Sequence, residues 1–279
     1  MITSGALLRE TKRALRAVVP MPILNWREAQ YYARYGEVEL QLLEYLCRAD
    51  CDAIDVGAND GCYVHFMRRY SRRVIAFEPL QWFVRGLAKR FRHDVVIHDI
   101  ALSRAAGVAT LRVPLIDEHL VAGCASLSLD AAQQYPAYRE VEVRTARLDD
   151  IYDGEVGFIK IDVEGHELAV LDGAHDTIAR CRPNMLVEID ERLSPDGISQ
   201  ISGSFAPLGY RGLFIFDRHL RPIEQFDRAT MQRPEDLPDL AGRLEERERF
   251  GAYIYNFLFV PQETSTTTLR AIEERLQQL

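Results

Sequence analysis

Short apolar runs alternate with helical stretches along most of the chain. Runs of four to six residues rich in Val, Ile and Phe predict buried strands, and the stretches between them repeat apolar positions at helical spacing. Strands that alternate with helices indicate an α/β fold, with a mostly parallel sheet covered on both faces. The five core runs are Ala53–Val56, Val74–Phe77, Val95–His98, Val156–Ile161 and Met185–Ile189.

The pattern changes in the middle and towards both ends. Two extended pieces, Ala109–Val113 and Glu140–Thr145, flank a polar loop, and later strands are expected at Leu213–Phe216 and Tyr253–Val260. Residues 7–19 form a basic amphipathic segment, which can lie on an anionic membrane surface or pack on its own domain. We divide the chain into an N-terminal helical extension (1–50), a central domain (51–261) and a C-terminal helix (262–279).

The composition narrows the class of protein. A chain of 279 residues, 47% of them hydrophobic, can build one large α/β domain. Its net charge of −8 argues against a nucleic-acid partner, because phosphates repel an acidic surface. We expect no transmembrane segment and no signal peptide, since no apolar run reaches the ~18–20 residues that a bilayer requires. Five scattered cysteines without a CxxC motif are typical of free thiols in the cytoplasm.

A glycine-containing turn follows the first core strand. It runs from Asp55 through Gly57, Asn59 and Gly61 to Tyr63. Glycine permits close backbone approaches, and the helix that follows presents unpaired N–H groups. The GxNxG spacing departs from the GxGxxG fingerprint of dinucleotide-binding folds. The turn is therefore either a nucleotide-binding turn of another type or a tight connection without a ligand.

Acidic residues follow the second and third strands. Glu78 stands about twenty residues beyond the glycine turn, where a carboxylate can accept hydrogen bonds from a ribose diol. Asp99 can accept a hydrogen bond from the exocyclic amine of adenine, or it can begin a turn. The coincidence of Glu78 with the glycine turn favours a nucleoside site.

The densest group of ionisable side chains follows the fourth strand. Asp162, Glu164, His166 and Glu167 lie within six residues. A carboxylate beside an imidazole suits proton removal, because the carboxylate can orient the ring. The same set can bind a divalent metal or cap a helix. Glu188, inside the fifth apolar run, either faces the ligand cleft or has a buried partner, and we favour the cleft.

Seven segments together carry a family resemblance. In order they are DVGANDGCY (Asp55–Tyr63), AFEP (Ala76–Pro79), ALS (Ala101–Ser103), LDD (Leu148–Asp150), FIKIDVEGHE (Phe158–Glu167), VLDGA (Val170–Ala174) and LVEI (Leu186–Ile189). The chain resembles the FkbM family of S-adenosylmethionine-dependent methyltransferases from about Glu37 to Pro261. The resemblance implies the class I methyltransferase fold, which is Rossmann-like, with a seven-stranded sheet, an antiparallel last strand and helices on both faces.

The resemblance also implies roles for individual residues. The segment from Asp162 to Glu167 would face the transferred methyl group. Glu78 would hold the ribose hydroxyls, and Asp99 would lie near adenine, where the family often has Asn. The first cofactor turn would consist of Asp55, Gly57, Asn59, Gly61 and Tyr63.

We interpret the chain as an S-adenosylmethionine-dependent O-methyltransferase acting on a hydroxyl of a sugar, glycan or natural product. His166 is the favoured general base, and Asp162 or Glu164 would orient it or the acceptor hydroxyl, with Glu188 nearby. The irregular stretch Pro114–Tyr138 is expected to shape the acceptor pocket.

Two other classes of function share part of this pattern. An NAD-dependent oxidoreductase would use the glycine turn and Glu78, and a non-catalytic methyltransferase-like binding protein would keep the fold alone. Within the methyltransferase interpretation, a divalent metal at the acidic group is a secondary alternative. The sequence determines neither the acceptor nor the oligomeric state.

Overall fold

The computed structural model describes residues 30–92, 94–116, 119–237, 250–264 and 266–279. The basic amphipathic segment 7–19 lies outside these residues. Of the proposed N-terminal extension, residues 30–35 are helical and are followed by η1 (Val38–Gln41) and α3 (Leu43–Leu46).

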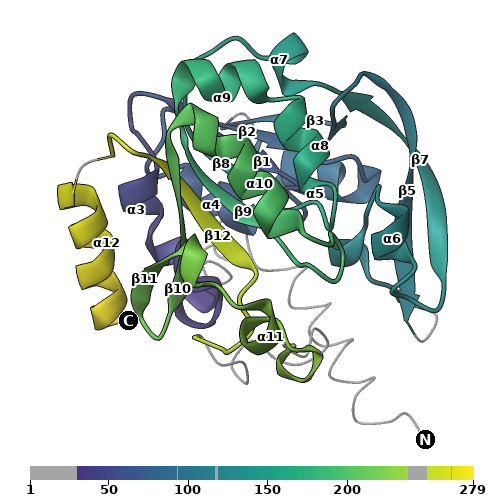
Figure 1. The fold of residues 1–279 in the computed structure, drawn as a ribbon. Helices are drawn as coiled ribbons and strands as arrows, with labels where there is room; N and C mark the ends of the chain where they lie inside the picture. Colours follow the sequence, from purple (N-terminus) through teal and green to yellow (C-terminus); the bar gives the residue numbers. More distant parts are fainter. Residues whose placement is uncertain (1–29, 93, 117–118, 238–249, 265) are drawn as a thin grey trace, which may run out of the picture.

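A single large sheet runs through the middle of the described part of the chain (Figure 1). Its strand order is β11-β10-β12-β9-β8-β1-β2-β3. The five strands from β9 to β3 pair in parallel, and β12 is antiparallel to both of its neighbours. The bounds are β1 (Asp52–Val56), β2 (Arg73–Phe77), β3 (Val95–His98), β8 (Val156–Ile161), β9 (Asn184–Glu188), β10 (Tyr210–Phe216), β11 (His219–Pro222) and β12 (Asn256–Pro261).

The expected mostly parallel sheet with an antiparallel last strand is confirmed, but the strand count was wrong. Among the described residues the sheet has eight strands, not seven, because β10 and β11 form a hairpin. The turn between them is Asp217-Arg218, and both residues have positive φ angles, 47° and 63°. Two left-handed residues in succession match the twist of a tight hairpin, and this turn carries no glycine that would have marked it in the sequence.

A second, smaller sheet is built from the stretch between β3 and β8. Its order is β4 (Ala101–Leu102), β7 (Tyr138–Ala146), β5 (Gly107–Ile116) and β6 (His119–Leu120). The two predicted extended pieces lie inside β5 and β7, which pair antiparallel from Gly107↔Thr145 to Pro114↔Tyr138. This sheet has its own small core and stands at the right of Figure 1.

The large sheet separates two hydrophobic cores. Successive residues of a strand point to opposite faces, so Ile54 packs into one core and its neighbour Ala53 into the other. The core of Ile54 is covered by α8 (Glu167–Asp172), α9 (His175–Cys181) and α10 (Gly197–Phe205). The core of Ala53 is covered by α3, α4 (Cys62–Met67), α5 (Gln81–Phe91) and the C-terminal α12 (Thr266–Gln278). The predicted two-sided helical cover is therefore confirmed.

Shorter helical segments complete the described chain: η2 (Ala122–Cys124), α6 (Leu129–Ala132), α7 (Leu148–Ile151), η3 (Ala206–Leu208), η4 (Ile223–Gln225), α11 (Arg228–Met231) and η5 (Pro234–Asp236). None of the helices in the described ranges combines the length and the apolar character that a bilayer crossing requires. All five cysteines are free thiols, as predicted.

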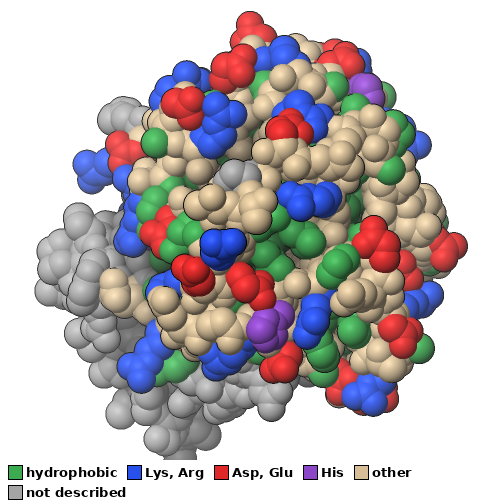
Figure 2. All heavy atoms as spheres, turned by 60° about the vertical axis from the view of Figure 1, so that its left-hand side comes forward, with side chains coloured by type: hydrophobic (Ala, Val, Ile, Leu, Met, Phe, Trp, Pro, Cys, Tyr) green, Lys and Arg blue, Asp and Glu red, His purple; other side chains and the backbone are tan. Residues whose placement is uncertain are grey.

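Charged side chains of both signs are interleaved on the surface. Figure 2 shows one face of the molecule, and blue and red groups alternate over it without a large area of one sign. On this face the net charge of −8 is not concentrated in a patch. Several carboxylates lie instead inside the molecule, at the carboxyl ends of the parallel strands.

Candidate functional site

A pocket opens at the carboxyl ends of β1, β2 and β8. This is where ligands bind in open α/β sheets. Residues of the second sheet and of the segment between β6 and β7 also line it. The lining residues are Val56, Gly57, Asn59, Phe77, Glu78, Pro79, Leu80, Ile100, Ala101, Leu102, Leu111, Ala122, Gly123, Ala125, Leu127, Asp162, Val163, Glu164 and His166.

The glycine turn forms the part of the pocket that follows β1. The N–H groups of Gly57 and Ala58 both donate to the carbonyl oxygen of Phe77, at 3.0 and 3.1 Å. Gly57 has a φ of +79°, and a Cβ there would overlap the carbonyl oxygen of Asp162. Gly61, with a φ of +83°, stands directly before α4 and outside the lining of the pocket. The close packing of the β1 turn on the segment after β8 therefore requires glycine at position 57.

Glu78 is held in the pocket by two backbone donors. Its Oε2 accepts a hydrogen bond from the N–H of Asn59 at 2.9 Å, and its Oε1 accepts one from the N–H of Leu80 at 2.8 Å. Only 5% of the residue is exposed, and this burial raises the pKa of the carboxyl to about 7. Each oxygen keeps a further lone pair, so the group can still accept hydrogen bonds from ligand hydroxyls.

Four of the predicted cofactor residues do not line the pocket: Gly61, described above, and Asp55, Tyr63 and Asp99. Asp55 is buried, neither of its carboxylate oxygens has a hydrogen-bond partner among the described residues, and burial raises its pKa to about 6. Tyr63 is also buried, and its hydroxyl donates to Glu37 Oε2 at 2.5 Å. Asp99 forms an ion pair with Arg144 outside the pocket, while the next residue, Ile100, lines it.

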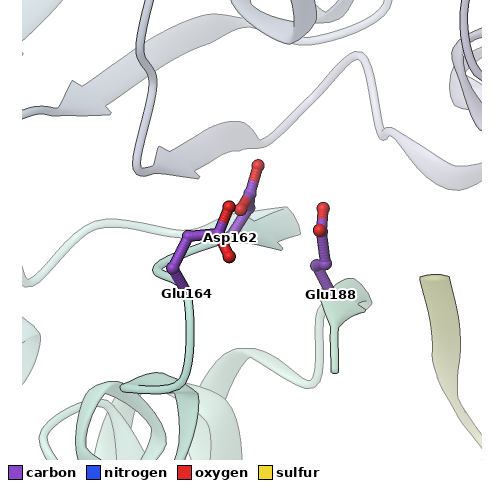
Figure 3. A group of neighbouring side chains, drawn as sticks. All are labelled: Asp162, Glu164 and Glu188. Atoms are coloured by element: carbon purple, nitrogen blue, oxygen red, sulfur yellow. The ribbon is translucent and has the colours of Figure 1, made fainter. Parts of the chain in front are cut away.

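Three carboxylates gather at the ends of β8 and β9. Oxygens of Asp162, Glu164 and Glu188 lie within 4.8 Å of one another, and Figure 3 shows the three side chains grouped together. Burial, followed by the charge of Asp162, raises the pKa of both glutamates. Asp162 and Glu164 line the pocket, whereas Glu188 does not. The three carboxylates therefore lie together, but the expectation that Glu188 faces the ligand cleft is not met.

His166 lines the pocket but has a different partner from the one predicted. Its Nε2 lies 2.9 Å from Ser103 Oγ, and no hydrogen bond in the described part of the chain joins it to Asp162 or Glu164. The positive φ angles of Glu164 (53°) and Gly165 (91°) turn the chain between the carboxylates and the imidazole. Burial, followed by the charge of Arg104, lowers the pKa of His166 to about 4, so the ring is neutral at pH 7.

Glu167 supports the turn before α8. Its Oε1 accepts a hydrogen bond from the N–H of Gly165 at 2.8 Å, and the residue is 2% exposed. Burial raises the pKa of this carboxyl to about 7. Glu167 is the first residue of α8 and does not line the pocket. Its carboxylate therefore matches the helix-capping alternative rather than proton removal or metal binding.

Part of the predicted acceptor loop reaches the pocket. Ala122, Gly123, Ala125 and Leu127 line it, and Ser126 Oγ donates to the carbonyl oxygen of Glu164 at 2.5 Å. Residues 117 and 118 lie outside the described residues. This loop therefore lines part of the pocket and also stabilises the turn at Glu164 through the Ser126 hydrogen bond.

Sequence reasoning missed three polar residues next to the acidic group. Lys160 Nζ lies 2.6 Å from Asp162 Oδ2, and Asn256 Nδ2 donates to Glu37 Oε2 at 3.3 Å. A lysine inside the apolar run of β8 was a visible signal. Glu37 and Asn256 carried no such signal, because they come from distant parts of the chain.

The acidic group has the donor chemistry of a metal site, since carboxylate oxygens suit hard divalent cations. However, the ammonium group of Lys160 already contacts Asp162 and supplies a positive charge there. A metal ion beside it would meet a like charge, so these residues do not fit a resident metal well, and we derive no step through one.

A model of the methyltransferase FkbM domain matches residues 55–213, which is more than half of the chain. The chain belongs to the FkbM methyltransferase family. This confirms the predicted resemblance and the class I methyltransferase fold, to which this chain adds β11. The matched range includes the glycine turn, Glu78 and the acidic group of this FkbM domain, so the oxidoreductase alternative is set aside.

Several solved structures are similar to this FkbM-family chain at low identity. A methyltransferase FkbM from Methylobacillus flagellatus KT is 16% identical (TM-score 0.46) over 76% of this chain and 44% of that one. An rRNA methylase from Streptococcus thermophilus is 8% identical (TM-score 0.42; 80% and 92% covered). A putative methyltransferase from Streptococcus mutans, in complex with SAH, is 7% identical (TM-score 0.38; 80% and 94% covered).

The match therefore spans less than half of the length of the Methylobacillus flagellatus protein. A comparison with curated proteins found no match.

Proposed function

We propose that this protein is an S-adenosylmethionine-dependent O-methyltransferase whose acceptor is a hydroxyl of a sugar, glycan or natural product. The observation that carries the proposal is the composition of one pocket. Glu78, fixed by two backbone N–H groups, stands in the same pocket as Asp162, Glu164 and His166. One part of the pocket suits a ribose, and another suits a cation and a proton transfer.

The residues of the pocket fit the proposed cofactor. Glu78 would accept hydrogen bonds from the ribose hydroxyls, and Leu80, Ile100 and Ala101 supply apolar surface for the base. The carboxylates of Asp162 and Glu164 favour a positively charged sulfur. When bound, S-adenosylmethionine supplies a methyl group on a sulfonium, which leaves as a neutral thioether.

The protein's own part in the reaction is alignment and proton removal. The acceptor oxygen forms a bond to the methyl carbon as the carbon–sulfur bond breaks, and the hydroxyl proton passes to a base. His166 is our favoured base, because its lowered pKa keeps the imidazole neutral and Ser103 orients the ring. Asp162 and Glu164 would position the acceptor hydroxyl.

Two features support the proposed class of acceptor: the net negative charge of the chain and the residues that line the pocket. An acidic chain disfavours RNA and DNA, and the polar groups around His166 suit a hydroxylated small molecule or glycan. Ala122 to Leu127, which follow β6, would contribute to acceptor selection.

Two measurements test this function. Calorimetric titration should show binding of S-adenosylmethionine and none of NAD, and absence of cofactor binding would favour a non-catalytic protein. Mass spectrometry should then detect the gain of a methyl group on a member of a panel of sugars, lipid-linked glycans and polyketides, with an RNA fragment as the negative member. Activity that is lost with EDTA and restored by Mg²⁺ would revive the metal alternative.

A further inference from the structure

Lys160 is an unusual residue in this chain. Only three of the 34 basic residues are lysines, Lys12, Lys89 and Lys160, and all the others are arginines. Lys160 is 5% exposed and lies within β8, one residue before the end of the strand. Ammonium and guanidinium groups are not equivalent, because an ammonium is a compact point charge that fits a narrow space.

Lys160 lies among acidic groups from several elements. Its Nζ is 2.6 Å from Asp162 Oδ2 and 4.8 Å from the centre of the Tyr63 ring. Asp55, whose carboxylate lacks a hydrogen-bond partner in the described chain, is its register partner on β1. Burial by itself would lower the pKa of Lys160, but the charges of Asp162, Asp55, Glu37 and Glu188 raise it.

Segments outside the matched methyltransferase domain complete this arrangement. Glu37 accepts hydrogen bonds from the Tyr63 hydroxyl and from Asn256 Nδ2. Asn256 is in turn the register partner of Glu188 across β12 and β9. Groups from before, within and after the domain are therefore linked near Lys160, while Asp162 lines the pocket.

We propose that Lys160 is a positioning residue of the methyl-transfer site. Its ammonium group fixes the Asp162 carboxylate at the pocket and offsets the negative charge of the neighbouring carboxylates. Without it, Asp162 has no buried cation to hold it, and mutual repulsion drives the carboxylates to rearrange or take up protons. The effect on turnover rests on the proposed function, but the pairing itself does not.

The pairing is tested by NMR on protein labelled with [ε-¹³C]lysine. Three lysine signals are expected, and Lys160→Met and Lys89→Met assign two of them. The Lys160 signal should remain in its protonated position near pH ~10.4, where ordinary lysines are half titrated. Asp162→Asn should lower its titration midpoint by about one pH unit or more, since the nearest charge is removed.

The control for that substitution is Asp153→Asn, at an exposed residue. A Lys160 signal that titrates with the other two lysines, or that ignores Asp162→Asn, overturns the proposal. Because the first measurement uses the wild-type protein, a variant that does not fold leaves the pairing testable.

The catalytic consequence is tested on Lys160→Met and Lys160→Arg, with Lys89→Met as the control. Lys160→Met should lower turnover by about 10²-fold, the scale expected for a misplaced catalytic geometry. The acid limb of its pH–activity profile should also move to higher pH, because removing a cation raises the pKa of nearby acids. Lys160→Arg keeps the charge and should leave that limb in place.

A uniform loss of activity at every pH would mean that Lys160 only supports the fold, and it would overturn the positioning role. If the wild-type protein neither binds S-adenosylmethionine nor transfers methyl, the proposed function fails, whereas the lysine titration still decides the pairing.

Discussion

Gly57 and Asp162 are in close backbone contact directly after the ends of the adjacent parallel strands β1 and β8. A Cβ on Gly57 would overlap the carbonyl oxygen of Asp162, and the N–H of Asp162 donates to the carbonyl oxygen of Val56 at 3.1 Å. The turn that would hold the cofactor and the segment that would face the methyl group are therefore one unit. Displacing either moves the other.

Gly57→Ala should disturb both stability and cofactor binding. The positive φ of +79° and the overlap with Asp162 together should cost about 2–4 kcal/mol of unfolding free energy, measured by chemical denaturation. Gly86→Ala is the matched control, since no atom lies within 4 Å of its Cβ position in the middle of α5. It should stabilise the protein by up to ~1 kcal/mol. Equal effects at the two positions would contradict the contact.

Glu78→Gln should weaken S-adenosylmethionine binding by about 10–100-fold, measured by calorimetry. Both oxygens of Glu78 accept from backbone N–H groups, and an amide can satisfy only one of these donors. Glu142→Gln, on the exposed side of β7, serves as the control and should bind like the wild type. Unchanged affinity in Glu78→Gln would remove this residue from the cofactor site.

Cofactor affinity should rise with pH through about 7, the pKa to which burial raises Glu78 in the free protein. Ligand hydroxyls donate to the ionised carboxylate, so binding favours the deprotonated form and is weaker where the free protein holds the proton. Titrations between about pH 6 and about pH 8 should show this rise in the wild type. An affinity that does not change over this range would show that Glu78 does not ionise on binding.

His166→Ala should lower turnover by about 10²–10⁴-fold while cofactor affinity stays close to that of the wild type. The imidazole lines the pocket, whereas the cofactor contacts proposed above do not include it. His175→Ala is the control, because that side chain is exposed at the start of α9. If turnover of His166→Ala is unchanged, the base is another group of the pocket, with Glu164 the first to test.

The contribution of Glu167 and Asp55 to stability should fall as pH rises from about 4 to about 7. Burial raises the pKa of Glu167 to about 7 and of Asp55 to about 6, so the folded protein keeps protons that the unfolded chain has already released. Each unit of pKa difference corresponds to about 1.4 kcal/mol. Glu167→Gln removes one of these groups and should flatten the decline in unfolding free energy. An unfolding free energy with the same pH dependence in Glu167→Gln and in the wild type would contradict the raised pKa of Glu167.

The sequence was a sufficient guide to the large sheet. Apolar runs such as Val156–Ile161 are recognisable because a strand buried on both faces has no polar side, and the polar residues after it mark its carboxyl end. The hairpin of β10 and β11 was missed because the left-handed pair Asp217-Arg218 contains no glycine. Local patterns carry little information about such a turn.

The candidate site was likewise only partly predictable from the sequence. Which residues follow each strand is a property of the sequence, and it predicted the meeting of Asp162, Glu164 and Glu188. Which partner each side chain chooses depends on contacts between segments far apart in the chain. His166 pairs with Ser103, and Asp99 turns to Arg144 outside the pocket.

The amino-acid sequence by itself thus determined the family, the central sheet and the edge at which the chemistry gathers. Only the tertiary structure decided that Lys160 supplies the buried positive charge and that Asn256 is hydrogen-bonded to Glu37. The physical reason is that apolar periodicity is a local property that a strand displays along its own length. Compensation of a buried charge is not local, since it requires groups that the fold brings together from separate elements.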